Sequence, residues 1–464
     1  MLRQKANLYW VGAILAIFII FPILFTGYSN LKRAEDAKKE GDFAAASQAY
    51  AQTAKFFFWQ QGLYEQAGIN AVKAGNFSEA IPYFQKQATL SEEGWYWFCS
   101  AHLQLGELDS ALSVCGEGVN QYDSAELYSL LAFTYRTQKK WDSEMRALTE
   151  QARLDPSDAF IAYRLGLLLT LYAPDAALPE LTRASALNPE VDSAAQALRT
   201  ALAVSSQLSD PSMKLVVVGQ AFGLVQDWEL AQAAFEQALQ LDEKNAEAWA
   251  WLGEAKQQTG GDGSVELDKA LSLDRSSVNV RALRGLYWSR QGKYEQMLAE
   301  YLLAARNEPQ NPRWQASIGE AYMKLGDLVE ALTAYQRAVE LAPTEAEYWR
   351  LLALFCVDNN VQVETLGMQA AQQALVLAPN DPAALDVLGY AYLSTGRYAN
   401  AEETLNLAIE LEPQLYSAHL HLAITFLAEG NRAAAFNSLT YVRDAEGAGV
   451  YRETARQLLD KYFQ

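Results

Sequence analysis

Residue types that most often carry catalysis or bind metals are scarce in this chain. Among 464 residues only His102, His419 and His421 are histidines, and the last two lie on one predicted helix at a spacing that directs them to different faces. The sequence contains no His-Glu-x-x-His, no Gly-x-Ser-x-Gly and no Gly-x-x-x-x-Gly-Lys-Ser/Thr phosphate loop. We therefore expect no catalytic residue, no cofactor-binding residue and no metal ligand, and predict that the protein is not an enzyme.

Two further stretches resemble chemical sites only superficially. The sequence GGDGS, from Gly260 to Ser264, follows a predicted helix and has no strand before it, so we interpret it as a loop and not as a phosphate-binding turn. Acidic pairs such as Glu402 and Glu403 are typical of solvated helix faces, without the apolar pocket that acid-base catalysis needs.

The three cysteines, Cys99, Cys115 and Cys356, form no Cys-x-x-Cys motif, so neither a zinc ribbon nor a thioredoxin-like site is indicated. Cys99 falls at a small-residue position of one predicted helix and Cys115 at a large-residue position of the next, so their side chains could face each other. Two buried free thiols would satisfy this spacing. A disulfide would also satisfy it if the domain is exported.

The elements that would have to position any site are paired helices. The segment GDLVEALTAYQRAVELAP, Gly326 to Pro343, has the layout of GRYANAEETLNLAIELEP, Gly396 to Pro413: glycine, alanine five residues later, a large residue, a second alanine and a closing proline. Large and small residues recur at steps of three and four, which places them on one helix face. A second helical pattern precedes each glycine, so the unit is a helical hairpin.

These hairpins resemble tetratricopeptide repeats, whose period is about 34 residues. The positions that carry the resemblance are Gly319, Tyr322, Ala331, Tyr335, Ala338, Pro343, Gly389 and Tyr392. The resemblance implies an all-α fold, a right-handed superhelical α-solenoid of about twelve hairpins. Since a lone hairpin cannot bury enough apolar surface, each unit must pack on its neighbours.

The repeat register extends along most of the chain. The predicted turn residues are Gly41, Gly75, Gly106, Lys139, Gly260, Gly292, Gly326, Asn360, Gly396 and Gly430. We expect one block of repeats over 29–190, an irregular helical connector over 191–211, a second block over 212–449 and a capping helix over 450–464. Two prolines, Pro174 and Pro179, are expected to disturb the unit near 159–190. The unit at Ala346 has a longer turn, and the unit at Ala246 has a shorter second helix.

The N-terminus differs in kind from the repeats. After a basic tail, 1–7, the sequence has no charged residue between Ala6 and Leu31, and we predict a transmembrane anchor over 8–28. A helix of that length spans about 30 Å at ~1.5 Å per residue, the thickness of the hydrocarbon core. A cleaved signal peptide and a buried core helix are the alternatives, but only poor cleavage sites are present.

The orientation of such an anchor depends on its flanking charges. Arg3 and Lys5 precede the segment, and Lys32, Arg33, Lys38 and Lys39 follow it, so the positive-inside rule is nearly balanced. Because a short basic tail before a first apolar segment usually stays in the cytoplasm, we expect extracytoplasmic repeats. The predicted protein is single-pass, in a bacterial plasma membrane.

The formal net charge of the chain is −19. An acidic array is repelled by phosphate backbones, so nucleic acid is not an expected ligand. The acidity either keeps a long exposed surface soluble or attracts a basic partner.

What remains is binding of a protein or peptide in a concave groove lined by the first helix of each hairpin. The residues that we expect to line this groove project from first helices in the predicted register; they are Tyr96, Trp97, Tyr163, Trp251, Arg350, Leu351, Leu354, Val387, Tyr390, Leu393, Leu420, His421 and Ile424. The alternative role of each is packing between neighbouring helices. No small-molecule substrate is predicted.

Two functions remain open. One is a membrane-anchored scaffold or adaptor that binds protein partners and supports assembly of a complex at the membrane. The other is a non-catalytic accessory subunit of an envelope enzyme or secretion machine. The layout is similar to that of anchored tetratricopeptide proteins of bacterial envelope assembly, but the cysteine-rich metal module of the lipopolysaccharide-assembly type is missing. The Lys-x-x-x-Asn of carboxylate-clamp co-chaperones is also missing.

Overall fold

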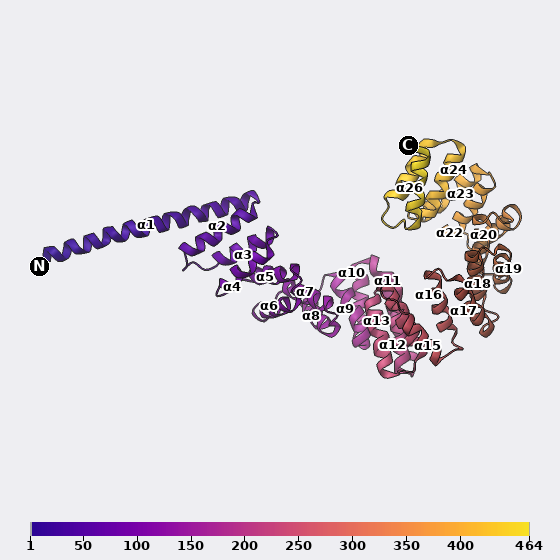
Figure 1. Ribbon diagram of the computed structural model, residues 1–464, viewed down its shortest axis with the longest axis horizontal. Helices are drawn as coiled ribbons and strands as arrows, with labels where there is room; N and C mark the ends of the chain where they lie inside the picture. Colours follow the sequence, from indigo (N-terminus) through magenta and orange to yellow (C-terminus); the bar gives the residue numbers. More distant parts are fainter. Residues whose placement is uncertain (1, 464) are drawn as a thin grey trace. The chain divides into compact units, whose positions relative to one another are not determined.

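A computed structural model describes the backbone of residues 2–463 and the side chains of residues 21–463 (Figure 1). These residues form 26 α-helices and two short helical turns of other types, and no strand occurs among them. The helices belong to two compact units, Met1–Gln237 and Ala238–Gln464, and the division falls inside α13 (Trp228–Leu241).

The first unit is built from antiparallel helix pairs and one unpaired helix. The pairs are α1 (Leu2–Glu40) with α2 (Phe43–Phe56), α3 (Leu63–Lys73) with α4 (Phe77–Lys86), α5 (Glu92–Gln104) with α6 (Leu108–Gln121), α7 (Ala125–Thr137) with α8 (Trp141–Leu154), and α9 (Ala159–Tyr172) with α10 (Pro174–Leu187). In the same way, Gly219 of α12 (Pro211–Leu224) packs against Phe235 of α13. The unpaired helix is α11 (Asp192–Gln207), which follows the 3₁₀ turn η1 (Pro189–Val191) and packs on α10 and α12.

The second unit continues the same pattern. Its pairs are α14 (Ala246–Gln258) with α15 (Ser264–Leu273), α16 (Val278–Arg290) with α17 (Tyr294–Asn307), α18 (Pro312–Leu325) with α19 (Leu328–Leu341), α20 (Ala346–Asp358) with α21 (Met368–Leu377), α22 (Pro382–Ser394) with α23 (Tyr398–Leu411), and α24 (Tyr416–Glu429) with α25 (Arg432–Asp444). A last helix, α26 (Val450–Phe463), buries Ala455 and Leu459 and exposes most of its other residues. It occupies the predicted capping segment.

Several first helices begin at a signal that is visible in the sequence. Asp210, Asn311 and Asp381 each precede a proline at the first helical position, and each accepts a bond from the backbone N–H two residues later, at 2.9–3.1 Å. The side chain satisfies a helix N–H that has no partner inside the helix, and proline at this position has no N–H to satisfy. These helices therefore start where the sequence predicts.

All ten predicted turn residues adopt a left-handed backbone, including the two that are not glycine, Lys139 (φ 55°) and Asn360 (φ 51°). Gln226 (φ 64°), between α12 and α13, is a further residue of this kind that the sequence did not single out. The predicted repeat register is thus confirmed at these turns.

Inside a hairpin, a small residue of the first helix receives a large residue of the second. A Cβ on Gly389 would lie 2.5 Å from Leu405 Cγ, and one on Gly285 would lie 2.3 Å from the Tyr301 ring. Real contacts are never so short, so only glycine lets these helices approach. Gly319 holds the same relation to Tyr335 in the next hairpin.

One local expectation is wrong, and the expected longer turn after α20 is present. Pro174 and Pro179 do not disturb their unit, since α9 and α10 form a regular pair. Pro174 begins α10, where its missing N–H costs nothing, and the helix continues through Pro179. The longer turn after α20 is itself helical in part, because η2 (Val363–Gly367) is a π-helical turn that leads into α21.

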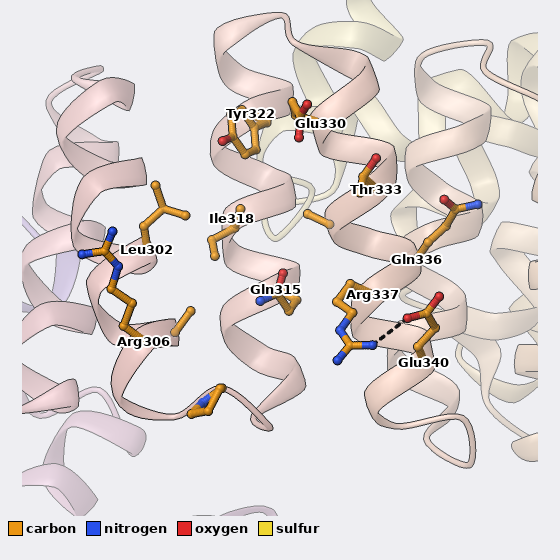
Figure 2. A pocket seen from close by; sticks show the side chains of 13 residues that line it. Leu302, Arg306, Gln315, Ile318, Tyr322, Glu330, Thr333, Gln336, Arg337 and Glu340 are labelled. Carbon is orange, nitrogen blue, oxygen red and sulfur yellow. Dashed lines mark hydrogen bonds and ion pairs between the residues drawn. The ribbon is translucent and has the colours of Figure 1, made fainter.

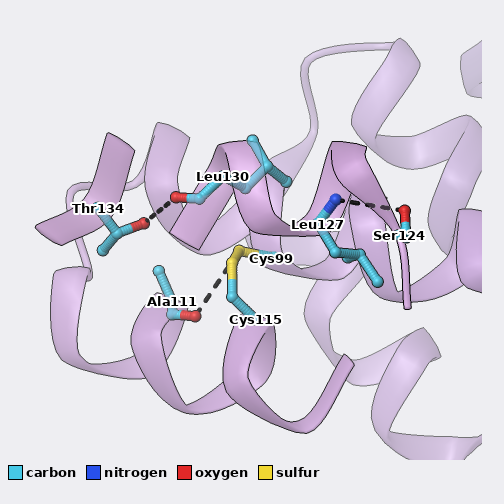
Figure 3. The surroundings of a disulfide bond; sticks show 7 residues. All are labelled: Cys99, Ala111, Cys115, Ser124, Leu127, Leu130 and Thr134. Atoms are coloured by element: carbon cyan, nitrogen blue, oxygen red, sulfur yellow. Dashed lines mark hydrogen bonds between the residues drawn. A yellow bond between two sulfur atoms is a disulfide. The ribbon is translucent and has the colours of Figure 1, made fainter. Parts of the chain in front are cut away.

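The hairpin of α5 and α6 contains a disulfide between Cys99 and Cys115, with Cα atoms 5.3 Å apart. Figure 3 shows the bond packed beside Ala111 and Leu127. Both cysteines are fully buried, and they occupy the small and large positions that Gly389 and Leu405 occupy in α22 and α23. Of the two alternatives left open by the sequence, the structure contains the disulfide. Cys356 is a buried free thiol whose pKa burial raises to about 11.

The predicted anchor, 8–28, falls within α1, and residues 8–20 of it lie outside the residues whose side chains are described. In the described part of the chain, no helix has both the length and the apolar character needed to span a membrane. The anchor therefore stays a prediction.

Candidate functional site

The first helices of the second unit lie next to one another: α14 contacts α16, α18 contacts α20, α20 contacts α22 and α22 contacts α24. We call the surface formed by these six helices the first-helix face. Such a surface is free of the packing between the two helices of a hairpin, so its side chains are available for a ligand.

A pocket of 420 Å³ opens on this face among α14, α16 and α18. Its walls include Trp251 and Leu286, and Trp314 is buried beside them. The predicted groove residue Trp251 thus lines an actual cavity. The apolar part of the wall could receive an apolar side chain, since water would be displaced from both surfaces.

The polar rim of this pocket is fixed by hydrogen bonds. The indole N–H of Trp314 donates to the Glu308 carboxylate at 2.8 Å, and the Asn311 amide donates to the same oxygen at 2.8 Å. These bonds, the one from Trp314 foremost, lower the pKa of Glu308, with a smaller contribution from Arg313. The hydrogen bonds therefore hold the anionic Glu308 carboxylate in place at the rim.

An ion pair braces the first-helix face next to the pocket. Arg290 of α16 donates to both carboxylate oxygens of Glu254 on α14, at 2.6 and 2.7 Å, and Glu254 is buried. A bidentate pair of this geometry fixes two neighbouring hairpins against each other. The sequence analysis missed it; the signal is an acidic residue directly after the packing glycine Gly253, with an arginine one hairpin later.

Farther along the face, four polar side chains from three helices form a cluster. His421 Nδ1 of α24 lies 2.7 Å from Asp386 Oδ1 of α22, and the Tyr390 ring stacks on the His421 ring at 4.0 Å and 10°. The Tyr390 hydroxyl donates to Asp358 at the end of α20. The sequence predicted Tyr390 and His421 as groove residues, but not the two acidic partners that hold them.

Partial burial sets the acidity of this cluster. It raises the pKa of Asp358, an effect that His421 and the bond from Tyr390 oppose. It also raises the pKa of Tyr390, and the neighbouring Asp358 adds to this. The polar groups satisfy one another, so the cluster is a rigid part of the face and not an open cavity.

Three of the predicted groove residues are core residues. Val387, Leu393 and Leu420 are buried, since the helices of adjacent hairpins close over them. Leu351 and Leu354 are half-buried and pack against a core cluster that contains Leu352 and Phe355. For these side chains the alternative role, packing between helices, is the one that the structure shows.

The other predicted residues keep some exposure. Arg350 and Ile424 are half-buried on the first-helix face. Tyr96, Trp97 and Tyr163 belong to the first unit: Lys73 lies 5.1 Å above the Trp97 ring, and burial, followed by Asp227, raises the pKa of Tyr163.

The first unit also holds a buried ion network that the sequence analysis missed. Glu144 is fully buried and accepts bonds from Arg136 and Arg164, at 2.6 and 2.8 Å, and Arg164 also reaches Asp227 at 2.6 Å. These partners come from α7, α8, α9 and the turn before α13, so only the folded chain brings them together.

A second pocket, of 630 Å³, lies on the opposite side of the hairpins, between α17 and α19. Figure 2 shows Ile318 and Tyr322 of α18 between Leu302 on one wall and Thr333 on the other, with Arg337 paired to Glu340. It contains none of the predicted groove residues. In the described part of the chain, no group of three or more His, Cys, Asp or Glu residues is arranged to hold a metal.

Family models match the second unit and the hairpin that leads into it. The model of the cilia and flagella-associated protein 70 C-terminal domain matches residues 265–458, and a tetratricopeptide repeat model matches residues 219–256. These hairpins are tetratricopeptide repeats.

Human cilia- and flagella-associated protein 70 is 28% identical to this chain, in a match that covers 37% of this chain. Human superkiller complex protein 3 is 25% identical, in a match that covers 52% of this chain. The match spans only 15% of each relative. Among solved structures, a chain of the APC/C hetero-tetramer Cut9-Hcn1 aligns over 96% of this chain and 99% of its own length, at 15% identity and a TM-score of 0.45.

Proposed function

We propose that this protein is a membrane-anchored tetratricopeptide scaffold that binds a protein segment on its first-helix face and supports assembly of a complex at the membrane. The observation that carries the binding role is the pocket around Trp251, because it is a preformed pocket with apolar and polar walls on the face formed by the first helices. Superkiller complex protein 3, by its name part of a complex, matches 52% of the chain and supports a role in assembly.

The pocket suits a segment with one large apolar side chain. That side chain would lie against Trp251 and Leu286, and the backbone on either side would follow the face between the rim at Glu308 and the pair of Arg290 with Glu254. A fixed wall reduces the entropy that is lost on binding, and Trp314 and Glu308 are already fixed by their hydrogen bond.

Two features support the membrane part of the proposal. The uncharged sequence over 8–28 has the length of a bilayer-spanning helix. The Cys99–Cys115 disulfide is of the kind that forms in oxidising compartments, which supports extracytoplasmic repeats. Alkaline extraction of native membranes, with protease added to intact cells, tests both: a protein released by alkali would refute the anchor, and repeats protected from protease would refute the orientation.

The binding role is tested with a photo-crosslinking amino acid in place of Leu286, which is 37% exposed on α16. The matched control replaces Leu407, which is 45% exposed on the second helix of another hairpin. We expect a discrete cross-linked product in native membranes from position 286 and not from 407. The substitution Trp251→Ala should abolish the product and leave the helical melting curve nearly unchanged.

Equal products at both positions, or a product that survives Trp251→Ala, would refute binding at this pocket. A product recovered in fixed ratio with one enzyme would point to the accessory-subunit alternative.

A further inference from the structure

The start of the described part of α1 exposes large apolar side chains on more than one face. Phe21, Phe25 and Tyr28 are 64–66% exposed, and Ile23 and Leu24 are exposed as well. Successive residues of a helix point about 100° apart, so these five side chains cover several faces and not one stripe. A helix beside an aqueous domain normally has one apolar stripe, whereas a helix that is apolar all round has an apolar environment.

A loop of the first repeat is fixed beside this surface. α2 ends at Phe56, and the ring of Phe57 packs so closely on α1 that a Cβ on Gly27 would lie 2.6 Å from it. The N–H of Gln60 donates to the Phe57 carbonyl at 2.8 Å and closes a turn. Gly27 thus lets the loop contact α1 directly, at the level of Phe25 and Tyr28.

The next two residues of the loop are aromatic and open to solvent. Phe58 is 82% exposed and Trp59 is 58% exposed, and their rings meet edge to face at 5.0 Å. Large aromatic side chains left outside a core mark a surface that contacts something else. We call Phe58 and Trp59, together with Phe25 and Tyr28, the aromatic collar.

We propose that the aromatic collar sits in the headgroup region of a lipid bilayer, so that the α2–α3 loop dips into the membrane surface beside α1. The proposal rests on the membrane anchoring proposed above and specifies how the first repeat meets the bilayer. Aromatic side chains with one polar group favour this interface, because the ring is apolar and the N–H or O–H stays hydrated.

The charges around the collar support lipid over another protein. Lys32 and Arg33, one turn beyond Tyr28, are exposed, and so is Lys55 near the end of α2. Anionic lipid headgroups attract such cations at the membrane surface. The exposed residues also continue directly into the sequence that has no charge back to Ala6. A second protein copy would cover one side of α1, whereas lipid would contact each of the faces on which these apolar side chains are exposed.

The test uses the full chain in vesicles of phosphatidylcholine and phosphatidylglycerol, with Cys356→Ala so that the disulfide contains the only remaining native cysteines. An environment-sensitive fluorophore is attached at Phe58→Cys. The matched control carries the same label at Phe160→Cys, a phenylalanine that is 72% exposed at the start of α9 in the same unit. Lipids with a nitroxide near the headgroup serve as quenchers.

We expect the protein to float with the vesicles, and the label at position 58 to shift its emission to shorter wavelength and to lose intensity with the quenching lipid. The label at 160 should show neither change. If the protein floats but both labels behave alike, the collar does not enter the bilayer and the anchor stands. A label at 58 that is shielded from iodide but not quenched by lipid would show that a second protein copy covers the collar. A protein that fails to float would refute the anchor itself.

Discussion

The hairpins of α5–α6 and of α22–α23 place different chemistry at equivalent positions. In α22–α23, Gly389 leaves room for Leu405, and in α5–α6 a disulfide joins Cys99 to Cys115 across the same interface. The repeat spacing determines which two residues meet, and their chemistry determines how strongly they hold. A packed pair responds to changes in side-chain volume, whereas a covalent pair responds to reductant.

Removal of the disulfide should have the largest effect. The disulfide closes a loop between residues 16 positions apart. The double substitution Cys99→Ser with Cys115→Ser should therefore lower the free energy of unfolding of the first unit by about 3 kcal/mol, because the unfolded chain regains conformational entropy. Hydrogen exchange of α5 and α6 measures this loss.

A second variant sharpens the comparison. Cys99→Gly with Cys115→Leu recreates the pair found in α22–α23 and should recover part of the lost protection. If it is no more stable than the double serine variant, position and spacing alone do not define the interface.

Overpacking of the glycine pair should have a somewhat smaller effect. Gly389→Leu places atoms where Leu405 already lies, and such insertions cost about 1–3 kcal/mol. The control is Gly116→Ala on α6, since a Cβ there meets nothing within 4 Å. Denaturant unfolding, followed in the unit that carries each substitution, should show a loss of stability for Gly389→Leu alone. An equal loss for Gly116→Ala would mean that the contact with Leu405 is not the cause.

The smallest expected effect is on the pH dependence of stability, through His419 of α24. His419 bonds to the carbonyl of Pro413 at 3.0 Å, and burial lowers the pKa of His419. The folded state therefore favours the neutral ring, so its contribution to stability is complete above pH ~6.5 and is lost as the pH falls through the lowered value. In His419→Gln, the free energy of unfolding should decrease less between pH 7 and pH 5 than in the parent protein, with a difference of about 1 kcal/mol or less. An unchanged slope would show that other groups cause it.

Most of the fold could be predicted from the sequence, because a 34-residue period sets the helices, the turns and the small-to-large contacts together. Even the non-glycine turns at Lys139 and Asn360 followed from the register. Gln226 did not, since glutamine carries no turn signal. The π-helical turn at Val363 was missed because an insertion in a loop has no periodicity to indicate its path.

The candidate site was less predictable. The repeat register predicts which residues lie on the first-helix face. It does not predict that Val387, Leu393 and Leu420 are buried, because the next hairpin covers them. How closely hairpins approach depends on side chains far apart in sequence. For the same reason the partners of His421 and Arg290, Asp386 and Glu254, could not be named beforehand.

The left-handed residues other than glycine also bear on how the array comes apart. Lys139, Gln226, Asn360 and Gln362 hold a backbone conformation that L-residues adopt at a cost of about 1 kcal/mol. Each repeat of the array is supported only by its neighbours, so the hairpins with these turns are expected to be the least stable. Heating or pulling should open the array at these hairpins first, so that it unfolds in segments and not in one cooperative step.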